Sequence, residues 1–388
     1  METLPNRSWA EVDLDCIAHN TRRIRALTRK TAEVMGVVKA DAYGHGVSRV
    51  VPVLLENGVT RLAVSMLDEA LELRRQGVDV PILVLGYTDP RRAEEIIAGD
   101  VTQTVYSRDL AQSLSDAASR IGREARIHIK IDTGMGRVGF LAGFEAVRDT
   151  MWIHNLPHII IEGAYTHFAS ADEEDPAYTF RQYALFTGVC SELDAGGVTI
   201  PIKHVCNSAA ILRFPAMHLD MVRAGLVLYG MLPSPFCGGS HGLLPAMTLK
   251  ANVILCKAVE AGSPISYGRT YVTPGPTRIA TIPIGYADGY PRSLAGKASV
   301  LIGGCRAPVA GRICMDMCMI DVGSLPYDVS VGDEAVLFGR QGEGEILIEE
   351  IADWMGTINY EVTCLIGRRV PRAYLSGGQI GAVSNYLL

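Results

Sequence analysis

The stretch VMGVVKADAYGHG, residues 34–46, carries the pattern on which the fold prediction rests. A short apolar run ends at Lys39, and a polar, glycine-containing turn follows it. Such a run is typical of a strand that is buried on both faces of a parallel sheet. Lys39 would then lie at the carboxyl end of the strand, where barrel enzymes place their functional groups.

Seven further runs of this kind precede residue 240, and helical patterns such as LDEALELRRQG (67–77) separate them. Asp89 and Pro90 have the residue types of a helix cap and a first turn. Eight strands alternating with helices over about 230 residues predict a (β/α)8 barrel, although a doubly wound sheet would show the same alternation. The seven runs are RLAVSM from Arg61, PILVLG from Pro81, VTQTVY from Val101, RIHIKID from Arg126, IIIEGAYTHF from Ile159, IKHVCNSA from Ile202 and VRAGLVLYG from Val222.

The texture of the sequence changes after about residue 242. Helical periodicity is lost apart from EEIADWM (349–355), and runs of β type punctuated by Gly and Pro replace it. We therefore predict two domains, a barrel over residues 1–240 and an all-β domain over residues 241–388. The runs of β type are ANVILCKAV (251–259), RIATIPIG (278–285), ASVLIG (298–303), APVAGRICMDMCMIDV (307–322) and EAVLFG (334–339).

Composition argues against several classes of function. The net charge is −6, from 36 basic and 42 acidic residues, so we expect no nucleic-acid or membrane partner. The long uncharged stretch 224–249 is broken by three prolines and five glycines and cannot form a membrane span. The N-terminus has no signal-peptide pattern, and the nine cysteines form no CxxC pair. We expect a cytoplasmic protein without a disulfide framework or a metal site.

The position of Lys39 allows two interpretations. Dry surroundings at the strand end would lower its pKa and make the amine a nucleophile toward a carbonyl. A solvated ammonium at the end of a strand is the alternative, and position alone favours it. The wider string VVKADAYGHG, however, resembles the lysine segment of the alanine racemase family, enzymes with a barrel and a β domain. The resemblance implies that Lys39 carries pyridoxal 5′-phosphate as a Schiff base and that Tyr43 contacts its phosphate.

The segment HIKIDTGMGRVGF (128–140) also has two interpretations. Its GxGxxG spacing follows a strand, as in a dinucleotide-binding turn, but no helical pattern opens after it. The segment resembles the same family, with Lys130 and Arg137 at matching positions. The resemblance implies that Arg137 approaches the phenolic oxygen of the cofactor and the substrate carboxylate. It also implies that Lys130 could be carbamylated and hold Arg137 in place. The alternative is that Lys130 is a lysine on the solvent side of a strand.

Two residues of the later barrel strands match the family's cofactor partners. Arg223 lies in an otherwise apolar run, and an unpaired buried guanidinium would be very unfavourable. The resemblance implies that Arg223 bonds the pyridine nitrogen and that His167 bonds Arg223. A permanent cation there would disfavour protonation of the nitrogen, weaken the ring as an electron sink and limit side reactions.

The phosphate of the cofactor is expected at the loops after the last two barrel strands. Backbone N–H groups converge there in many barrels, independently of any family resemblance. The resemblance implies that the same loops bind it and adds a tyrosine from the second half of the chain. The implied phosphate-binding residues are Asn207, Ser208, Gly225, Leu226 and Tyr360.

The second half of the chain resembles the substrate side of the family's site. Tyr267 in PISYGRTY matches a tyrosine that faces the lysine from the other subunit of a homodimer. The implied substrate contacts are Tyr286, Cys314, Met315 and Asp316. One departure from the family is Met317, where many members carry Gln.

Together, the matches predict a two-base racemisation of alanine that would supply D-alanine for peptidoglycan. Lys39 would take the proton of the D-enantiomer and Tyr267 of the partner that of the L-enantiomer. Tyr267, Tyr286 and Tyr360 would crowd the substrate pocket and so favour alanine. Serine or a broader range of amino acids is an alternative. A decarboxylase of the same architecture and a non-catalytic pyridoxal-phosphate binding protein are further alternatives.

Overall fold

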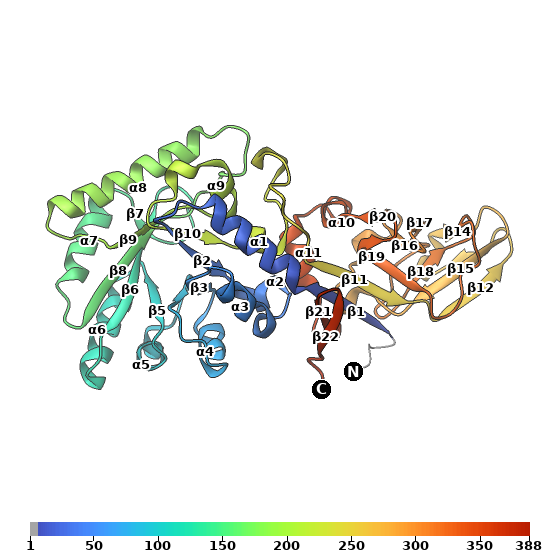
Figure 1. The fold of residues 1–388 in the computed structure, drawn as a ribbon, viewed down its shortest axis with the longest axis horizontal. Helices are drawn as coiled ribbons and strands as arrows, with labels where there is room; N and C mark the ends of the chain where they lie inside the picture. The colour runs from blue at the N-terminus through green and yellow to red at the C-terminus, as the bar shows by residue number, and fades with distance from the viewer. Residues whose placement is uncertain (1–6) are drawn as a thin grey trace. The chain divides into compact units, whose positions relative to one another are not determined.

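The computed structural model describes residues 7–388 and divides into two compact units that interleave along the chain (Figure 1). One unit comprises Ile17–Ala42 and Val50–Leu244. The other comprises the chain up to Cys16, together with Tyr43–Arg49 and Pro245–Leu388. The linear division at residue 240 stays a prediction.

The first of these units is a nearly closed parallel barrel. Its eight strands pair in the order β10-β2-β3-β4-β5-β6-β8-β9. Two backbone hydrogen bonds link the first and last strands of this order, from Asp220 N to Lys203 O at 3.1 Å and from Arg223 N to Cys206 O at 3.0 Å. Each predicted run contains one strand, so the barrel prediction is confirmed. The strands are β2 (Glu33–Val37), β3 (Arg61–Val64), β4 (Ile82–Val84), β5 (Thr102–Val105), β6 (Ala125–Asp132), β8 (Ile159–Tyr165), β9 (Ile202–His204) and β10 (Met221–Ala224).

Helices pack on the outside of the barrel strands (Figure 1). In α6 (Arg108–Ile121), the Ser107 side chain accepts from Leu110 N, and Gly122 ends the helix in the left-handed conformation. Asp89 caps a 3-10 turn, Pro90–Arg92, that leads into the next helix, as its residue types predicted. The other helices are α1 (Leu14–Leu27), α3 (Val47–Glu56), α4 (Leu67–Arg75), α5 (Ala93–Ala98), α7 (Phe144–His154), α8 (Ala177–Ala195) and α9 (Ser208–Arg213).

One predicted strand was too long. In VRAGLVLYG only the beginning lies in β10, and Leu226–Tyr229 forms the 3-10 helix η3. Gly225 separates the two with φ −120° and ψ −100°, values outside the strand region. An apolar run alone could not distinguish these structures, because both are fully buried.

The second unit is rich in strands. Its main sheet has the order β17-β16-β19-β11-β1-β21-β22, with β20 added beside β19. A three-stranded sheet, β12-β15-β18, and a small hairpin, β13-β14, complete its strands. The strands are β1 (Ser8–Asp13), β11 (Met247–Asn252), β12 (Leu255–Val259), β13 (Pro264–Ile265), β14 (Tyr271–Val272), β15 (Thr277–Ile282), β16 (Ser299–Ile302), β17 (Cys305–Pro308), β18 (Cys318–Asp321), β19 (Glu334–Gln341), β20 (Gly344–Ile346), β21 (Arg372–Ser376) and β22 (Gln379–Ser384).

This unit is not purely β. The pattern EEIADWM lies in the helix α10 (Ile348–Met355), and the segment TINYEV (357–362), which lies within the predicted all-β domain, begins a second helix, α11 (Asn359–Leu365). Asn359 Nδ2 donates to Glu349 Oε1 at 2.9 Å, and this bond ties the two helices together. The seven residues of α11 were too few for helical periodicity to be visible in the sequence.

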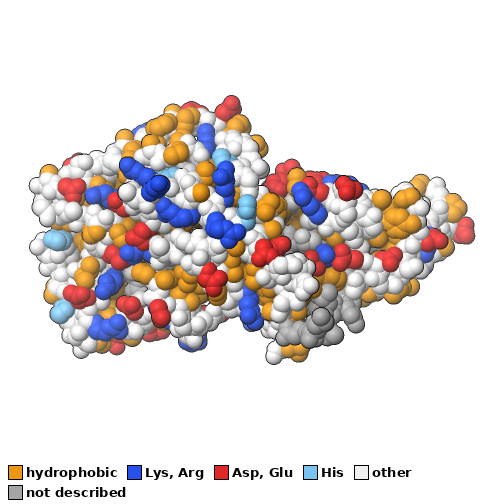
Figure 2. All heavy atoms as spheres, in the orientation of Figure 1, with side chains coloured by type: hydrophobic (Ala, Val, Ile, Leu, Met, Phe, Trp, Pro, Cys, Tyr) orange, Lys and Arg blue, Asp and Glu red, His pale blue; other side chains and the backbone are white. Residues whose placement is uncertain are grey.

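The surface carries charges of both signs. On the face in Figure 2, basic and acidic side chains are interspersed between apolar areas. Within residues 7–388, no helix has the length and apolar character needed to cross a membrane.

A β-bulge shapes the barrel interior between β6 and β8. Ile127 pairs with Ile161, but His128 pairs with Gly163, so Glu162 is an extra residue on β8. A Cβ atom at Gly163 would lie 2.6 Å from His128 Cε1 and 2.8 Å from Ile202 O. Only glycine therefore leaves room for the imidazole beside this strand.

We predict that Gly163→Ala destabilises the protein by about 1–3 kcal/mol, because the added methyl group overpacks the barrel interior. The matched control is Gly188→Ala in α8, where an added Cβ meets no atom within 4 Å. Gly188→Ala should stabilise the protein by roughly 0.5–1 kcal/mol, since alanine favours a helix. Urea unfolding followed by circular dichroism measures both changes, and equal unfolding midpoints for the two variants would contradict the packing argument.

Candidate active site

Lys39 begins an unusual turn at the carboxyl end of β2. This turn, α2 (Lys39–Tyr43), has left-handed backbone angles at Ala40, Asp41, Ala42 and Tyr43, with φ between 53° and 55°. The left-handed conformation costs a non-glycine residue roughly 1–2 kcal/mol. Backbone strain of this kind persists only where the surroundings enforce it, and it clusters at functional sites.

The carboxylate of Glu69 holds this turn in place. It accepts hydrogen bonds from Ala40 N at 2.6 Å and from Ser65 N at 2.7 Å. The first of these groups follows β2, and the second follows β3. One side chain therefore fixes the carboxyl ends of two neighbouring strands and, with them, the position of Lys39.

Arg223 lies in the barrel interior with only 4% of its surface exposed. Nη1 donates to His204 Nδ1 at 2.9 Å and to His204 O, and Nη2 donates to the carbonyls of Thr166 and Val205. Among residues 7–388, its Nε–H forms no hydrogen bond. This N–H group is therefore a donor left for a ligand.

His167 follows β8 and lies beside Arg223, with Nδ1 3.4 Å from Nη2. Burial holds the pKa of His167 well below its usual range, and the charges of four cations lower it further. The imidazole is therefore neutral near pH 7. The four cations are Arg223, Lys130, Arg137 and Lys39.

Lys130 lies inside the barrel, so the alternative of a solvent-facing lysine is wrong. Its surface is 2% exposed, and its Nζ lies 5.2 Å from the centre of the Tyr165 ring. Burial and then the charge of Arg223 lower the pKa of Lys130 to about 7. A large fraction of this amine is therefore uncharged near neutral pH.

The GxGxxG segment forms a loop rather than a dinucleotide-binding turn. The Asp132 side chain accepts from Gly134 N at 2.9 Å and Gly136 N at 3.1 Å. The short strand β7 (Phe140–Leu141), and not a helix, follows. The carboxylate therefore shapes the loop that carries the exposed Arg137.

The predicted phosphate residues lie after β9 and β10. Asn207 caps α9 by accepting from Ala210 N at 3.0 Å. The Ser208 hydroxyl accepts from Gly225 N at 3.1 Å, which ties the two loops together. Leu226 is buried at the start of η3.

The second unit brings the remaining predicted residues into two groups. Tyr43 and Tyr360 lie with their ring centres 6.5 Å apart. Separately, Tyr286 N donates to Cys314 O, and Ser266 Oγ, next to Tyr267, donates to Arg312 O at 2.6 Å. Met315 accepts from Ala287 N, Arg369 pairs with Asp316 at 2.8 Å, and Met317 accepts from Cys314 N.

Sequence reasoning missed a set of polar residues behind Arg223. His204 contacts Arg223 directly, and His128 and Glu162 continue the contacts into the barrel. The available signal was the presence of His and Glu within strands that are otherwise apolar. Among residues 7–388, no three His, Cys, Asp or Glu side chains are grouped as metal ligands.

A barrel with a strained lysine turn and two buried basic residues, Lys130 and Arg223, at the carboxyl ends of its strands has the arrangement of a barrel enzyme. Residues 12–233 match the family model "Alanine racemase, N-terminal domain", and residues 246–374 match "Alanine racemase, C-terminal domain". The alanine racemase of Clostridium tetani is 48% identical over 381 residues, which are 98% of each chain. That of Methanococcus maripaludis is 48% identical over 368 residues, covering 95% of this chain and 98% of the relative.

Solved structures agree with these matches. The alanine racemase of Clostridium difficile 630 has a TM-score of 0.95 and 44% identity over the whole of both chains. The enzyme of Bacillus anthracis with bound L-Ala-P has a TM-score of 0.92 and 40% identity over 99% of each chain. The chain belongs to the alanine racemase family, whose members are isomerases.

The lowered pKa of Lys130 predicts that the stability of the protein depends on pH in buffers purged of carbon dioxide. The ordinary pKa of 10.5 applies to the unfolded chain, and about 7 applies to the folded one. Between these pH values the unfolded chain binds more protons, so stability rises with pH. Relative to Lys130→Met, the wild type should gain up to about 1.4 kcal/mol per pH unit in this window.

Urea unfolding of both proteins between pH 6 and pH 10 measures this difference. Lys203→Met, which removes a lysine that is only partly buried, is the matched control and should show no such trend against the wild type. A difference between wild type and Lys130→Met that does not change with pH would contradict the argument.

Proposed function

We propose that the chain interconverts L- and D-alanine with pyridoxal 5′-phosphate as its cofactor. The buried basic side chains of Lys130 and Arg223, which lie 5.2 Å and 5.1 Å from the centre of the Tyr165 ring, carry the proposal together with the strained turn after Lys39. Alanine is proposed as the substrate because the chain belongs to the alanine racemase family and its relatives carry that name. We further propose that the product supplies D-alanine for peptidoglycan in the cytoplasm.

The residues present fit this cofactor by the chemistry of their donors. The phosphate, the phenolic oxygen and the substrate carboxylate are anionic or strong acceptors, and the groups that act on His167 are cations. We assign Lys39 as the covalent tether and the Nε–H of Arg223 as the partner of the pyridine nitrogen. When bound, the cofactor supplies a ring that withdraws electrons from the Cα of the substrate. The proposed phosphate-binding residues are Tyr43, Asn207, Ser208, Gly225, Leu226 and Tyr360.

Arg223 and His167 would set the strength of that ring. A guanidinium remains charged at physiological pH, so it would make protonation of the neighbouring pyridine nitrogen unfavourable. Burial keeps His167 neutral, so it can accept from Arg223 without adding a second charge. A less strongly stabilised carbanion has fewer routes to side reactions, which suits a reaction that only moves a proton.

Arg137 would bind the substrate carboxylate, and Lys130 would hold Arg137 in place. The neutral amine of Lys130 can add carbon dioxide, forming a new N–C bond and releasing one proton. The resulting carbamate would be an anion in place of the neutral amine and would pair with Arg137. Met315 N–H would be a further donor, with Tyr286, Cys314 and Asp316 beside it.

Racemisation requires an acid–base group on each face of Cα. We propose Lys39 for one face and Tyr267 of the partner subunit for the other. Tyr267→Phe removes only the hydroxyl and should lower the racemisation rate in both directions by about 10²–10⁴-fold. The matched control is Tyr87→Phe, an exposed tyrosine of the barrel unit, which should retain the parent rate.

The assay incubates the protein with pyridoxal phosphate and L-alanine or L-serine and measures the D-enantiomer and released carbon dioxide. Faster formation of D-serine would indicate the broader substrate class, and carbon dioxide would indicate a decarboxylase. Absence of any D-amino acid would contradict the proposed function. Parent rates in Tyr267→Phe would contradict the two-base scheme alone.

We propose that two subunits share each site. Three substrate-side residues are well exposed in the single chain, Tyr267 at 70%, Met315 at 52% and Tyr286 at 41%. A homodimer that covers them would be isologous, so that each subunit completes the site of the other.

Mixing two variants of low activity tests this arrangement. Lys39→Ala and Tyr267→Phe, unfolded together and refolded, should form mixed dimers with one intact site each and regain activity. Each variant refolded alone is the control and should keep the low rate that it had before unfolding. If the mixture also keeps this low rate while mixed dimers are detected by mass spectrometry, both residues belong to the same subunit's site.

A further inference from the structure

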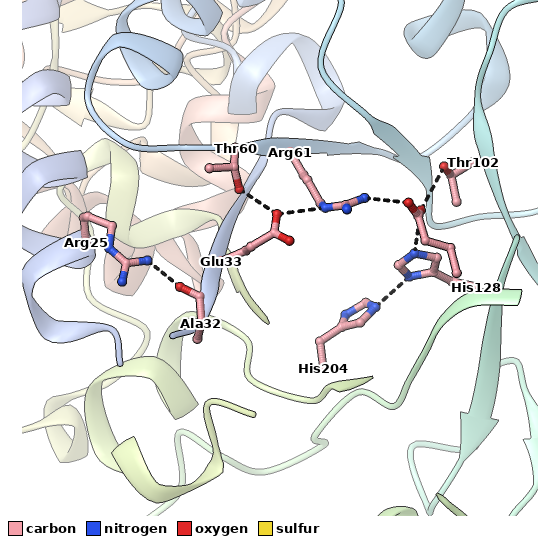
Figure 3. A network of polar contacts seen from close by, with 9 residues as sticks. Arg25, Ala32, Glu33, Thr60, Arg61, Thr102, His128 and His204 are labelled. Carbon is pink, nitrogen blue, oxygen red and sulfur yellow. Dashed lines mark hydrogen bonds and ion pairs between the residues drawn. The ribbon is translucent and has the colours of Figure 1, made fainter. Parts of the chain in front are cut away.

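A series of hydrogen-bonded polar side chains that includes Glu33, Arg61, His128 and His204 lies between the barrel strands (Figure 3), and Arg223 contacts its last member, His204. His204 Nδ1 lies 2.9 Å from Arg223 Nη1, and His204 Nε2 lies 2.8 Å from His128 Nδ1. His128 Nε2 lies 3.2 Å from Glu162 Oε2. Arg61 then contacts Glu162 at 3.1 Å and Glu33 at 2.9 Å.

This series of polar side chains extends along the barrel axis. Glu33 and Arg61 are the first residues of β2 and β3, at the amino ends of the parallel strands. Arg223 is the third residue of the four in β10, near the carboxyl ends. A carboxylate at the base of the barrel is thereby connected to the arginine that we assign to the cofactor.

The donors and acceptors allow only one order of protons while Glu162 is ionised. An ionised carboxylate can only accept, so the proton of His128 lies on Nε2 and His128 Nδ1 must accept. The proton of His204 therefore lies on Nε2, which donates to His128 Nδ1. His204 Nδ1 is then left to accept from Arg223, a guanidinium that can only donate. All hydrogen bonds between Arg223 and Glu162 therefore point toward Glu162.

The burial and charge of the groups agree with this order. Both histidines are at most 1% exposed, and burial lowers the pKa of each, so both are neutral. Burial raises the pKa of Glu162, but the His128 hydrogen bond and the charge of Arg61 outweigh it and leave the value at about 2. The Tyr165 ring stacks on His204 at 4.8 Å between centres and prevents the imidazole from tilting.

The bulge in β8 is what makes the chain possible. The extra residue at position 162 inserts the carboxylate next to His128, and Gly163 provides the space for the imidazole. A regular pairing of β6 and β8 would send residue 162 to the opposite face. Bulges beside functional sites commonly redirect a side chain in this way.

We infer that Glu162 is a positioning residue that acts on Arg223 through His128 and His204 by fixing the tautomers of both imidazoles. The inference rests on the proposed function for its effect on the reaction. If either histidine carried its proton on Nδ1, the chain would reverse and His204 would present an N–H to the Nη1 of Arg223. Two opposed donors would move the guanidinium away from the position that the cofactor requires.

The direct test is NMR of the full-length protein with 15N-labelled histidine, with and without pyridoxal phosphate. Couplings between ring nitrogens and carbon-bound protons distinguish the two tautomers. We expect His128 and His204 to be neutral Nε2–H tautomers, with signals assigned by His128→Gln and His204→Gln. An Nδ1–H tautomer or a protonated ring at either position at neutral pH overturns the inference, whether or not the protein racemises alanine.

Glu162→Gln tests the cause, because an amide can both donate and accept and so permits both directions of the chain. We expect a second tautomer to appear at His128 and His204 together, and turnover to fall on the order of tenfold with a smaller change in KM, the size typical of lost outer partners of a site histidine. Glu33→Gln is the matched control, since it removes the other carboxylate from Arg61 but contacts neither histidine.

The outcomes separate the two proposals. Unchanged tautomers in Glu162→Gln, or an equal loss of turnover in Glu33→Gln, overturn the role of Glu162 and leave the racemase proposal standing. A wild-type protein that forms no D-alanine contradicts the racemase proposal, and the tautomer measurement still decides the order of protons.

Discussion

Burial of the Arg223 guanidinium is the constraint on which the barrel interior depends. A buried charge without partners is very unfavourable. Within residues 7–388, Arg223 forms no ion pair with a carboxylate, and neutral acceptors bind it instead. The carbonyls of Thr166, His204 and Val205 must therefore converge at the ends of β8 and β9. The backbone course of these strands and the stability of the charge depend on each other.

The charge of Arg223 affects two titratable groups nearby, Lys130 and His167. It lowers the pKa of Lys130 and His167 beyond what burial alone does, so that both have large neutral populations near pH 7. A purely structural interior would place carboxylates beside these cations. The half-buried carboxylate of Glu162 lies two histidines away from Arg223. Within the described part of the chain, the one carboxylate charge that raises the pKa of Lys130 is that of Asp132, and burial and the charge of Arg223 outweigh it.

The turn after Lys39 is a second feature at the strand ends that is unfavourable for folding. Four consecutive residues adopt left-handed angles, and none of them is glycine. Glu69 compensates by holding the N–H groups at the ends of two strands. Strain at the lysine and charge at the arginine are both unfavourable for folding alone, and the closed barrel supports both.

Much of the fold could be predicted from local patterns in the sequence. The eight barrel strands, the lysine at the end of the first, and the β-rich second half follow from apolar periodicity and Gly/Pro punctuation, which are local properties. The helix α11 and the 3-10 helix η3 were not predicted, because seven helical residues or a fully apolar run carry no distinctive period. The pairing of β1 with β11 and β21 joins residues far apart in the chain, and no local pattern specifies such a partner. The same holds for the chain from Arg223 to Glu162. Its histidines are visible in the sequence as isolated polar residues, but their order of contact arises only when the barrel closes and a bulge moves one carboxylate inward.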